Sequence, residues 1–327
     1  MKIAVINDYQ NAFRTLSCYP KLGDHEVVVF TDTENDPVRL AERLGNFEVA
    51  VLTQQRSRFP RALIERLPNL RLISLTGARY SHIDIAACTE CGVVVSAGGG
   101  GRSNAAAELT WALILGALRH LPREVRQLRE GRWQSTLGTE IRGKTLGIYA
   151  FGKIGAIVAG VGRAFGARVV CWGREASTSR AREAGYEVAA SREAFFSSAD
   201  VLCLHLPLRD ETRGIVTRED LARMKASALL VNTSRAGLIA DGALVEAIRA
   251  GRPGFAAIDV YEREPVLDGD HPLLHMDNVT CTPHLGYVTR EAYEQYYGIV
   301  VDQILAFAAG SPINVANPEV LAGSNVK

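Results

Sequence analysis

Short apolar runs recur along the chain, separated by charged, amphipathic stretches such as those at 61–66, 177–184 and 242–250. The runs are continuous rather than alternating, which is typical of parallel strands that helices cover on both faces. They form two series: 3–6, 27–30, 49–52, 72–75 and 93–95, then 146–149, 169–172, 201–204, 229–231, 255–258 and 279–281. The pattern predicts the α/β class, with two doubly wound, Rossmann-like parallel sheets and an active-site cleft between their domains.

The boundaries of the two domains follow from the gap between the two series. A run of four glycines at 98–101 lies in this gap and suggests a hinge, with a surface loop as the alternative. A helix expected at about 289–309 would return to the first sheet. We therefore expect a discontinuous substrate domain of residues 1–101 and 287–327, flavodoxin-like in fold, and a dinucleotide-binding Rossmann domain of residues 102–286.

Length and charge narrow the class of protein. A chain of 327 residues is long enough for two domains, and 47% hydrophobic residues supply ample core. A net charge of +1 gives no reason to expect nucleic acid as a partner. The apolar stretch at 111–118 is shorter than the roughly 20 residues of a membrane span, and the N-terminal run is too short for a secretory signal. The expected location is the cytoplasm.

Six cysteines in a chain of this size do not indicate a disulfide framework. Cys88 and Cys91 have the spacing of a metal or redox pair, but no second pair follows at zinc-finger distance. We interpret both as packing residues and expect no metal.

A glycine-containing turn, AFGKIG at 150–155, follows a strand and opens a helix near Ile154. In that setting backbone N–H groups and the helix N-terminus can hold a pyrophosphate. Gly152 would let the pyrophosphate approach, and Gly155 would let the helix pack on the strand. Ala150 replaces the first glycine of the usual pattern, which is tolerable if its φ is negative. An ordinary crossover turn is the alternative.

The next strand ends in Gly173 and Arg174, where an NAD-specific site would carry a carboxylate for the adenosine ribose. Arg174 could instead pair with a 2′-phosphate, helped by Ser177, Ser179 or Arg180. The sequence therefore favours NADP(H) over NAD(H). Alternatively, Arg174 stacks on the adenine or stays in solvent.

Three more segments lie at the carboxyl ends of predicted strands, and they contain an arginine, a glutamate and a histidine. They are VNTSR (231–235), DVYEREP (259–265) and TPHLG (282–286). Taken singly, Arg235 and Glu264 are typical of surface charges and His284 of a structural histidine. Ligands of open α/β sheets, however, bind at the carboxyl ends of the strands, where all three lie. A cation for a carboxylate, an acid–base imidazole and a carboxylate to tune it suit hydride transfer on a 2-hydroxy or 2-keto acid.

Over nearly its whole length the sequence resembles the D-isomer-specific 2-hydroxyacid dehydrogenase family. Several motifs carry the resemblance. They are LRLISLTGARYSHID (70–84), AEL (107–109), the glycine turn, HLPL (205–208) with Thr212, VNTSRAG (231–237), DVYEREP (259–265) and TPHLG (282–286). The resemblance implies that Arg235 binds the substrate carboxylate, that His284 is the general acid or base, and that Glu264 orients His284 and keeps it protonated. It implies a homodimer with the Glu108 helix in the interface.

The resemblance also implies binding positions. Asp259 would meet the nicotinamide carboxamide, with a helix N-cap as its alternative role, and backbone amides near Ala78 and Arg79 would receive the substrate carboxylate. The implied cofactor-binding residues are Gly152, Lys153, Ile154, Gly155, Arg174, Leu206, Pro207, Thr212, Thr233, Ser234, Asp259 and Gly286.

One departure from the family pattern concerns the substrate. Arg79 stands where many members have glycine, and Gln54, Arg56 and Arg58 follow another strand of the first series. We hypothesise that Arg79, with Arg56, recognises a second anionic group of the substrate; a solvated rim is the alternative. The chain ends too soon for the regulatory domain of longer phosphoglycerate dehydrogenases.

The expected function is an NAD(P)-dependent 2-hydroxyacid dehydrogenase acting as a reductase of glyoxylate or hydroxypyruvate type on a small 2-keto acid. A phosphoglycerate-dehydrogenase-like oxidation is one alternative. A dinucleotide-sensing corepressor, a binding protein, is another.

Overall fold

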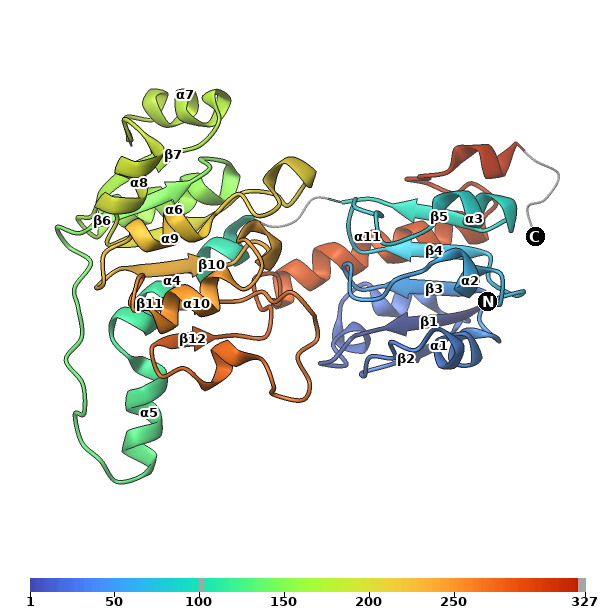
Figure 1. Ribbon diagram of the computed structural model, residues 1–327. Helices are drawn as coiled ribbons and strands as arrows, with labels where there is room; N and C mark the ends of the chain where they lie inside the picture. The colour runs from blue at the N-terminus through green and yellow to red at the C-terminus, as the bar shows by residue number, and fades with distance from the viewer. Residues whose placement is uncertain (100–102, 323–327) are drawn as a thin grey trace. The chain divides into compact units, whose positions relative to one another are not determined.

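The computed structural model describes residues 1–99 and 103–322, and the chain divides into two compact units (Figure 1). Unit 1 consists of Met1–Gly101 and Val288–Lys327, and unit 2 of Arg102–Tyr287. Both are α/β units built on a parallel sheet, which confirms the predicted fold class.

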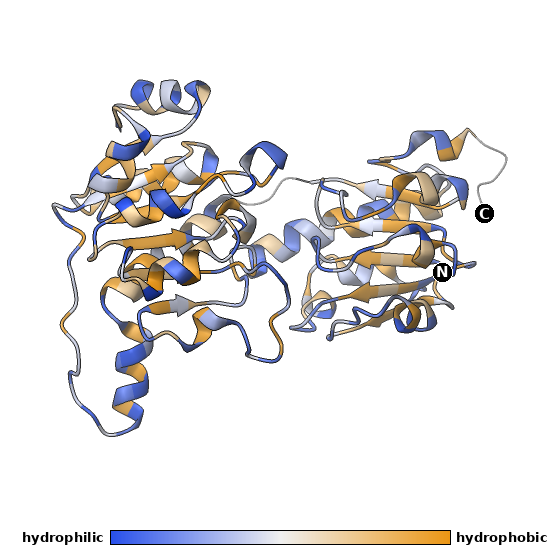
Figure 2. Ribbon diagram, viewed as in Figure 1, coloured by the Kyte–Doolittle hydropathy of each residue, from blue (hydrophilic) through white to orange (hydrophobic). Residues whose placement is uncertain are grey.

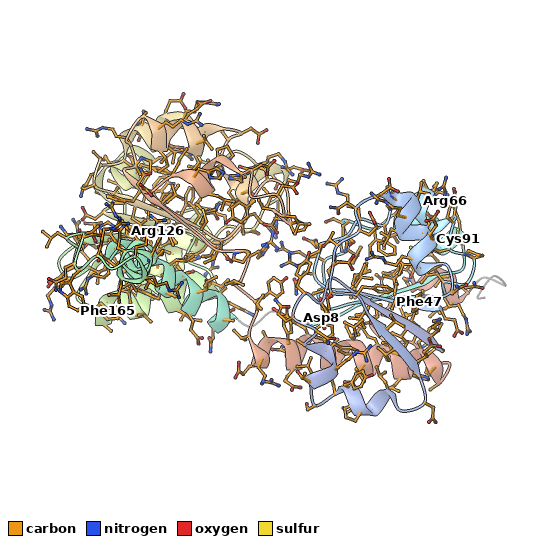
Figure 3. The ribbon with its side chains drawn as sticks, turned by 90° about the horizontal axis from the view of Figure 1, so that it is seen from below. Asp8, Phe47, Arg66, Cys91, Arg126 and Phe165 are labelled. Carbon is orange, nitrogen blue, oxygen red and sulfur yellow. The ribbon has the colours of Figure 1, made fainter. Side chains whose placement is uncertain are left out.

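The sheet of unit 1 has five parallel strands in the order β2-β1-β3-β4-β5. Its strands are β1 (Lys2–Ile6), β2 (Glu26–Val29), β3 (Val49–Leu52), β4 (Leu72–Leu75) and β5 (Val94–Ala97). One face packs on α1 (Pro37–Leu44), α2 (Arg61–Ile64) and α3 (Ile85–Glu90), and α11 (Arg290–Ala308) contacts β4. The side chain of Asp8, labelled in Figure 3, accepts the N–H groups of Ala12 and Phe13 and fixes the turn after β1.

The helix α11 joins unit 1 through polar as well as apolar contacts. The hydroxyls of Tyr297 and Thr53 lie 2.9 Å apart, and Ser74 donates to Gln303 Oε1 at 2.6 Å. These buried bonds join α11 to the residue after β3 and to β4 itself, although more than 200 residues separate them in sequence.

In the glycine run at 98–101, packing explains Gly98 and Gly99. Gly100 and Gly101 lie outside the described residues. A Cβ on Gly98 would lie 2.5 Å from Nδ2 of Asn314, and one on Gly99 would lie 2.6 Å from Cδ1 of Ile299. Gly99 also has a φ of +101°. Close approach and a positive φ therefore account for these two glycines without any hinge motion.

The sheet of unit 2 has seven parallel strands in the order β12-β11-β10-β9-β6-β7-β8. They are β6 (Thr145–Tyr149), β7 (Arg168–Trp172), β8 (Glu187–Val188), β9 (Val201–Leu204), β10 (Leu229–Asn232), β11 (Phe255–Ile258) and β12 (Val279–Cys281). Only β8 was not expected from the sequence, because two residues at a sheet edge form no apolar run.

Helices cover both faces of this sheet, which explains its continuous apolar strands. Leu230 packs on the face with α8 (Arg192–Ser198), α9 (Arg218–Arg223) and α10 (Ala243–Arg249). Its neighbours Leu229 and Val231 pack on the face with α4 (Ser103–Leu118), α6 (Lys153–Ala164) and α7 (Glu175–Glu183). For this reason most strand residues are hydrophobic, and they appear orange in Figure 2. In the described residues no helix is long and apolar enough to cross a membrane.

Residues 121–140 of unit 2 include no buried apolar residue. Helix α5 (Leu121–Arg129) and the irregular segment after it carry apolar side chains at their surface, including Trp133, which is 77% exposed, and Leu137, which is 94% exposed. The segment is nevertheless held in place, because Ser135 and Thr136 donate hydroxyl hydrogen bonds of 2.8 and 2.6 Å to Glu124. These bonds hold the pKa of Glu124 well below its usual range, at about 2.

Candidate active site

Three neighbouring strands of unit 2 deliver the predicted catalytic side chains. β10, β11 and β12 lie side by side in the sheet, and their carboxyl ends point to one edge. Arg235 follows β10, Asp259 and Glu264 follow β11, and His284 follows β12. The parallel topology therefore gathers residues up to 49 positions apart at one edge, where ligands of such sheets bind.

Glu264 and His284 are in direct contact. Oε2 of Glu264 lies 2.6 Å from Nδ1 of His284, and both side chains are partly buried. An ionised carboxylate only accepts hydrogen bonds, so the Nδ1–H of the imidazole is the donor. This leaves Nε2 as the nitrogen that can exchange a proton with a ligand.

Tyr261 holds both members of this pair and was not singled out by the sequence. Its backbone N–H donates to Oε1 of Glu264 at 2.9 Å, and its hydroxyl donates to the carbonyl oxygen of Thr282 at 3.0 Å. The His284 N–H donates to the same Thr282 oxygen at 3.0 Å. Burial raises the pKa of the Tyr261 phenol far above its usual range, so the hydroxyl remains a donor.

Asp259 is fully buried and organises the loop that carries His284. Its carboxylate accepts the Thr282 hydroxyl and the Leu285 N–H, both at 2.7 Å, and the Gly286 N–H at 2.9 Å. Burial raises the pKa of Asp259, and these donors oppose that shift. No helix begins at Asp259: the next helix after β11 is the 3-10 helix Pro272–His275, and His271 is its N-cap. The alternative role of Asp259 as a helix N-cap is therefore wrong, and its side chain caps the loop at 282–286 instead.

The His284 backbone is in a costly conformation. Its φ is +52°, in the left-handed region that non-glycine residues avoid at about 1–2 kcal/mol. Because Asp259 binds the N–H groups of the next two residues, the loop is kept in this shape. Strain of this kind is common where a side chain must be aimed at a ligand.

Arg235 stands on a loop fixed by the buried side chain of Asn232, a residue that the sequence did not single out. Asn232 donates to the Arg235 carbonyl oxygen at 2.9 Å and accepts the Ser234 N–H at 3.0 Å. Thr233 is tied to α4, since its hydroxyl lies 2.8 Å from that of Thr110. The Arg235 guanidinium is partly buried and donates to the Ser234 carbonyl oxygen at 2.6 Å.

The glycine turn lies between β6 and α6, the strand–turn–helix context expected of a dinucleotide site. Nothing lies within 4 Å of a Cβ built on Gly152, whereas one on Gly155 would lie 2.6 Å from the Ala150 carbonyl oxygen. Lys153 and Ile154 begin the helix. The expectation of a negative φ at Ala150 is wrong: its φ is +77°, because the turn keeps the shape of a glycine turn at a cost of about 1–2 kcal/mol.

Arg174 is exposed at the N-cap of α7, directly after Gly173. Its proposed helpers have other partners. Ser177 accepts the Phe151 N–H at 2.6 Å, and Arg180 donates to the Phe151 carbonyl oxygen at 3.2 and 3.3 Å. These two side chains hold the glycine turn, and Ser179 donates to Glu175 at 2.9 Å. A Cβ on Gly173 would lie 3.0 Å from the Ser177 hydroxyl, so the tight packing of the turn favours glycine there.

The loop after β9 contains the HLPL motif. Leu206 is buried, and the Thr212 hydroxyl donates to the Pro207 carbonyl oxygen at 2.7 Å, which closes the loop. His205 at the strand end is a residue whose role the sequence left open. Its Nε2 is buried with no hydrogen-bond partner among the described residues, and burial lowers its pKa to about 4.

The predicted substrate residues of unit 1 follow two adjacent strands. Arg56 lies four residues after β3, and Ala78 and Arg79 lie just after β4, both exposed. The Arg56 guanidinium lies 5.1 Å from the centre of the Tyr9 ring, a cation–π contact. The two loops are joined, because the Gln54 N–H donates to the Thr76 hydroxyl at 2.8 Å.

The cysteines are free thiols, and Cys88 is fully buried in the core of unit 1. No group of three or more metal-ligating side chains occurs among the residues that the structure describes.

Comparison with known proteins places these features in a family. Residues 111–286 match the model of the D-isomer specific 2-hydroxyacid dehydrogenase, NAD binding domain. A glyoxylate reductase from Aeropyrum pernix is 38% identical over 79% of this chain and 80% of its own length. A D-3-phosphoglycerate dehydrogenase from Archaeoglobus fulgidus is 35% identical over 91% of this chain, which spans only 56% of that relative.

Solved structures also resemble this chain. The crystal structure of a putative D-3-phosphoglycerate dehydrogenase oxidoreductase from Ralstonia solanacearum is 49% identical, with a TM-score of 0.96 over 100% of this chain and 99% of that one. A phosphoglycerate oxidoreductase from Vibrio cholerae is 47% identical, with a TM-score of 0.92 over 95% of this chain and 99% of that one.

Proposed function

The chain belongs to the D-isomer specific 2-hydroxyacid dehydrogenase family, and from this premise we propose that it reduces a small 2-keto acid of the glyoxylate or hydroxypyruvate type. As a member it is an oxidoreductase that uses a nicotinamide cofactor. The observation that carries the proposal is the 2.6 Å contact between Glu264 and His284 at the strand edge that also bears Arg235.

The turn at 150–155 fits a dinucleotide. The space at Gly152 and the N-terminus of α6 offer room and polar groups for it. The buried Nε2 of His205, which has no hydrogen-bond partner in the described part of the chain, is a further polar group for the dinucleotide. Besides the glycine turn, the residues proposed to hold it are Leu206, Pro207, Thr212, Thr233, Ser234, Asp259 and Gly286. When bound, the nicotinamide supplies or accepts the hydride.

His284 and Arg235 do the remaining work. The Arg235 guanidinium binds the substrate carboxylate and stabilises negative charge that develops on the keto oxygen. His284 delivers the proton from Nε2 to that oxygen, while Glu264 accepts the Nδ1–H bond and stabilises the imidazolium. In the oxidative direction His284 takes the proton back.

The test is steady-state turnover on a panel of glyoxylate, hydroxypyruvate, pyruvate and 3-phosphohydroxypyruvate, each with NADH and NADPH. The proposal expects reduction of at least one keto acid, and the same panel with Glu264→Gln should show a lower kcat. A protein that binds the cofactor but turns over none of these acids or their hydroxy acids would be a sensor rather than an enzyme.

Arg79 and Arg56 support a second candidate substrate class, one that carries an additional anion. Both lie beyond the ends of adjacent strands, and Arg56 is aligned by Tyr9. Relatives named D-3-phosphoglycerate dehydrogenase favour a phosphorylated acid. If the arginines bind that group, Arg79→Ala should lower kcat/KM much more on 3-phosphohydroxypyruvate than on glyoxylate. Equal losses on both acids would contradict this role.

We further propose that NADP(H) is preferred. Arg174 is exposed at the strand end, and the nearby Glu175 carboxylate is engaged by Ser179 and Arg182 at 2.9 and 3.0 Å. A guanidinium there would pair with a 2′-phosphate. Arg174→Gln should therefore lower kcat/KM for NADPH while sparing NADH. A wild-type preference for NADH would refute the proposal.

We also propose that the protein is a homodimer joined through α5, the segment after it and the helix α4, on which Glu108 is exposed. The occupant of this surface is a second copy, because Trp133 and Leu137 are exposed on a segment that Ser135 and Thr136 tie to α5 through Glu124. Light scattering should give a dimer for the wild type and a monomer for Trp133→Ser with Leu137→Ser. Leu267→Ser, which changes another exposed leucine, is the control. A monomeric wild type would refute the dimer.

Six free thiols suit a reducing compartment, and we propose the cytoplasm as the location. Fluorescence microscopy of a tagged chain tests it, and an export to an oxidising compartment would contradict it.

A further inference from the structure

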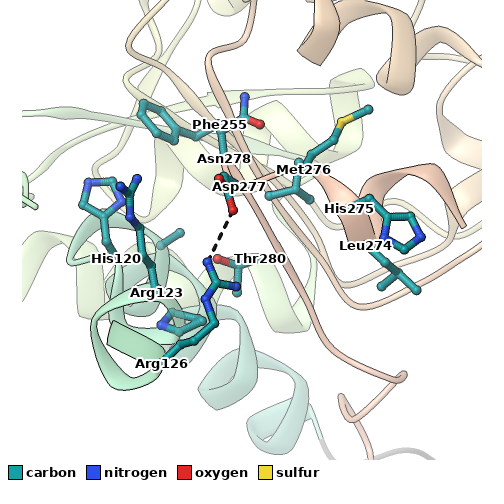
Figure 4. Close-up of a pocket in the computed structure, with 13 residues that line it drawn as sticks. His120, Arg123, Arg126, Phe255, Leu274, His275, Met276, Asp277, Asn278 and Thr280 are labelled. Atoms are coloured by element: carbon teal, nitrogen blue, oxygen red, sulfur yellow. Dashed lines mark hydrogen bonds and ion pairs between the residues drawn. The ribbon is translucent and has the colours of Figure 1, made fainter. Parts of the chain in front are cut away.

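A cavity of about 300 Å³ opens in unit 2 on the edge of the sheet opposite to His284. It lies between α5 and the segment that leads into β12, next to Phe255 at the start of β11 and Thr280 in β12 (Figure 4). The proposed catalytic residues follow the other ends of these strands, and none of them lines the cavity. The volume is at the lower limit for small-molecule sites.

Basic side chains line one wall of the cavity. His120, Arg123 and Arg126 line it from the side of α5, and Asp277 is the only carboxylate among its lining residues. Arg126 and Asp277 form an ion pair of 3.4 Å, drawn as the dashed line in Figure 4. Arg123 makes no hydrogen bond or ion pair with the residues that the structure describes. Two guanidiniums thus face one carboxylate.

The sequence of α5 separates this basic face from the apolar one. At about 100° per residue, Leu121, Val125 and Leu128 share one side of the helix. Arg123 and Arg126 fall on the other side, with the cavity. The apolar side is the proposed dimer surface, so a second copy bound there would not need the arginines.

We propose that this cavity binds a small anion that carries a phosphate or carboxylate group. The Arg123 guanidinium would bind it through paired N–H donors, and Arg126 would exchange its exposed contact with Asp277 for the ligand. That exchange costs little, because an ion pair exposed to solvent contributes little to stability. Thr280 adds a hydroxyl on the opposite wall. This site is independent of the proposed function.

Calorimetric titration with sodium phosphate and with sodium succinate tests the proposal. The protein is saturated with NAD(P)H and carries Arg235→Gln, Arg79→Ala and Arg56→Ala, so that neither the glycine turn nor the proposed substrate residues compete for anions. We expect saturable binding of one anion and at least tenfold weaker binding after Arg123→Gln. Arg129→Gln, a matched change on α5 outside the cavity, should leave the affinity unchanged.

The two anions distinguish a phosphate site from a carboxylate site. Saturation with either one, lost only in Arg123→Gln, supports the proposal. Failure of both anions to saturate, or equal weakening by Arg123→Gln and Arg129→Gln, overturns it. The readout is binding and does not depend on turnover, so it is separate from the test of the reductase.

Discussion

Glu264 and His284 meet at 2.6 Å although they follow different strands and lie 20 residues apart. The contact depends on Tyr261, whose N–H fixes the carboxylate and whose hydroxyl fixes the carbonyl oxygen two residues before the histidine. Asp259 fixes the backbone on the other side of His284. The imidazole is therefore held by its Nδ1–H and on both sides of its backbone, with Nε2 left to exchange a proton.

Tyr261 is expected to act as a positioning residue. Tyr261→Phe removes the hydroxyl bond to Thr282 but keeps the ring and its edge contact with His271. Loss of one hydrogen bond worth about 0.5–1.5 kcal/mol should lower kcat by roughly 2- to 12-fold and leave cofactor affinity unchanged. Steady-state kinetics across pH tests this, since a displaced imidazole also alters the pH profile. Tyr19→Phe, far from the site in sequence and in unit 1, is the control. Unchanged kcat and pH profile in Tyr261→Phe would remove the role.

The two glycines of the turn should respond differently to alanine. Gly152 has a φ of −98° and open space around its Cβ position, so Gly152→Ala should stabilise the fold by about 0.4–1 kcal/mol and yet weaken cofactor binding. Gly155→Ala drives a Cβ against the Ala150 carbonyl oxygen and should destabilise the fold by about 1–3 kcal/mol. Urea unfolding and fluorescence titration with NAD(P)H measure both quantities. Wild-type cofactor affinity in Gly152→Ala would mean that the pyrophosphate does not lie there.

Because His205 is buried, we expect the fold to lose stability in acid. Burial lowers its pKa to about 4 in the folded chain, against about 6.5 when unfolded, so the neutral form is the one that the fold accepts. The stability that depends on it is complete above pH 6.5 and is lost as the pH falls towards 4, by about 2 kcal/mol between pH 7 and 5.

Urea unfolding of wild type and His205→Asn at pH 7 and pH 5 measures this difference, which should shrink in the variant. His275→Gln changes an exposed histidine of the same unit and should keep the wild-type difference. An equal loss of unfolding free energy between pH 7 and pH 5 in wild type and in His205→Asn would show that His205 does not cause the acid sensitivity.

The sequence predicted the strands well because each is buried on both faces, and so each appears as a continuous apolar run. It also predicted that Arg235, Glu264 and His284 lie at one edge of the sheet, since each follows a strand end; their catalytic roles stay a prediction. It could not identify Tyr261 or Asn232, because their roles depend on a hydroxyl or an amide reaching backbone atoms of other loops. The φ of Ala150 was missed for a related reason: the turn is held by Ser177 and Arg180 from the next helix. Positioning of this kind becomes visible only in three dimensions.

Proton transfer by His284 is tested by the kcat of His284→Ala on the preferred keto acid. The variant should fold, bind NAD(P)H with nearly wild-type affinity and lose about 10²- to 10⁴-fold in kcat, the usual effect of removing an acid–base group. Turnover close to that of the wild type would contradict the account.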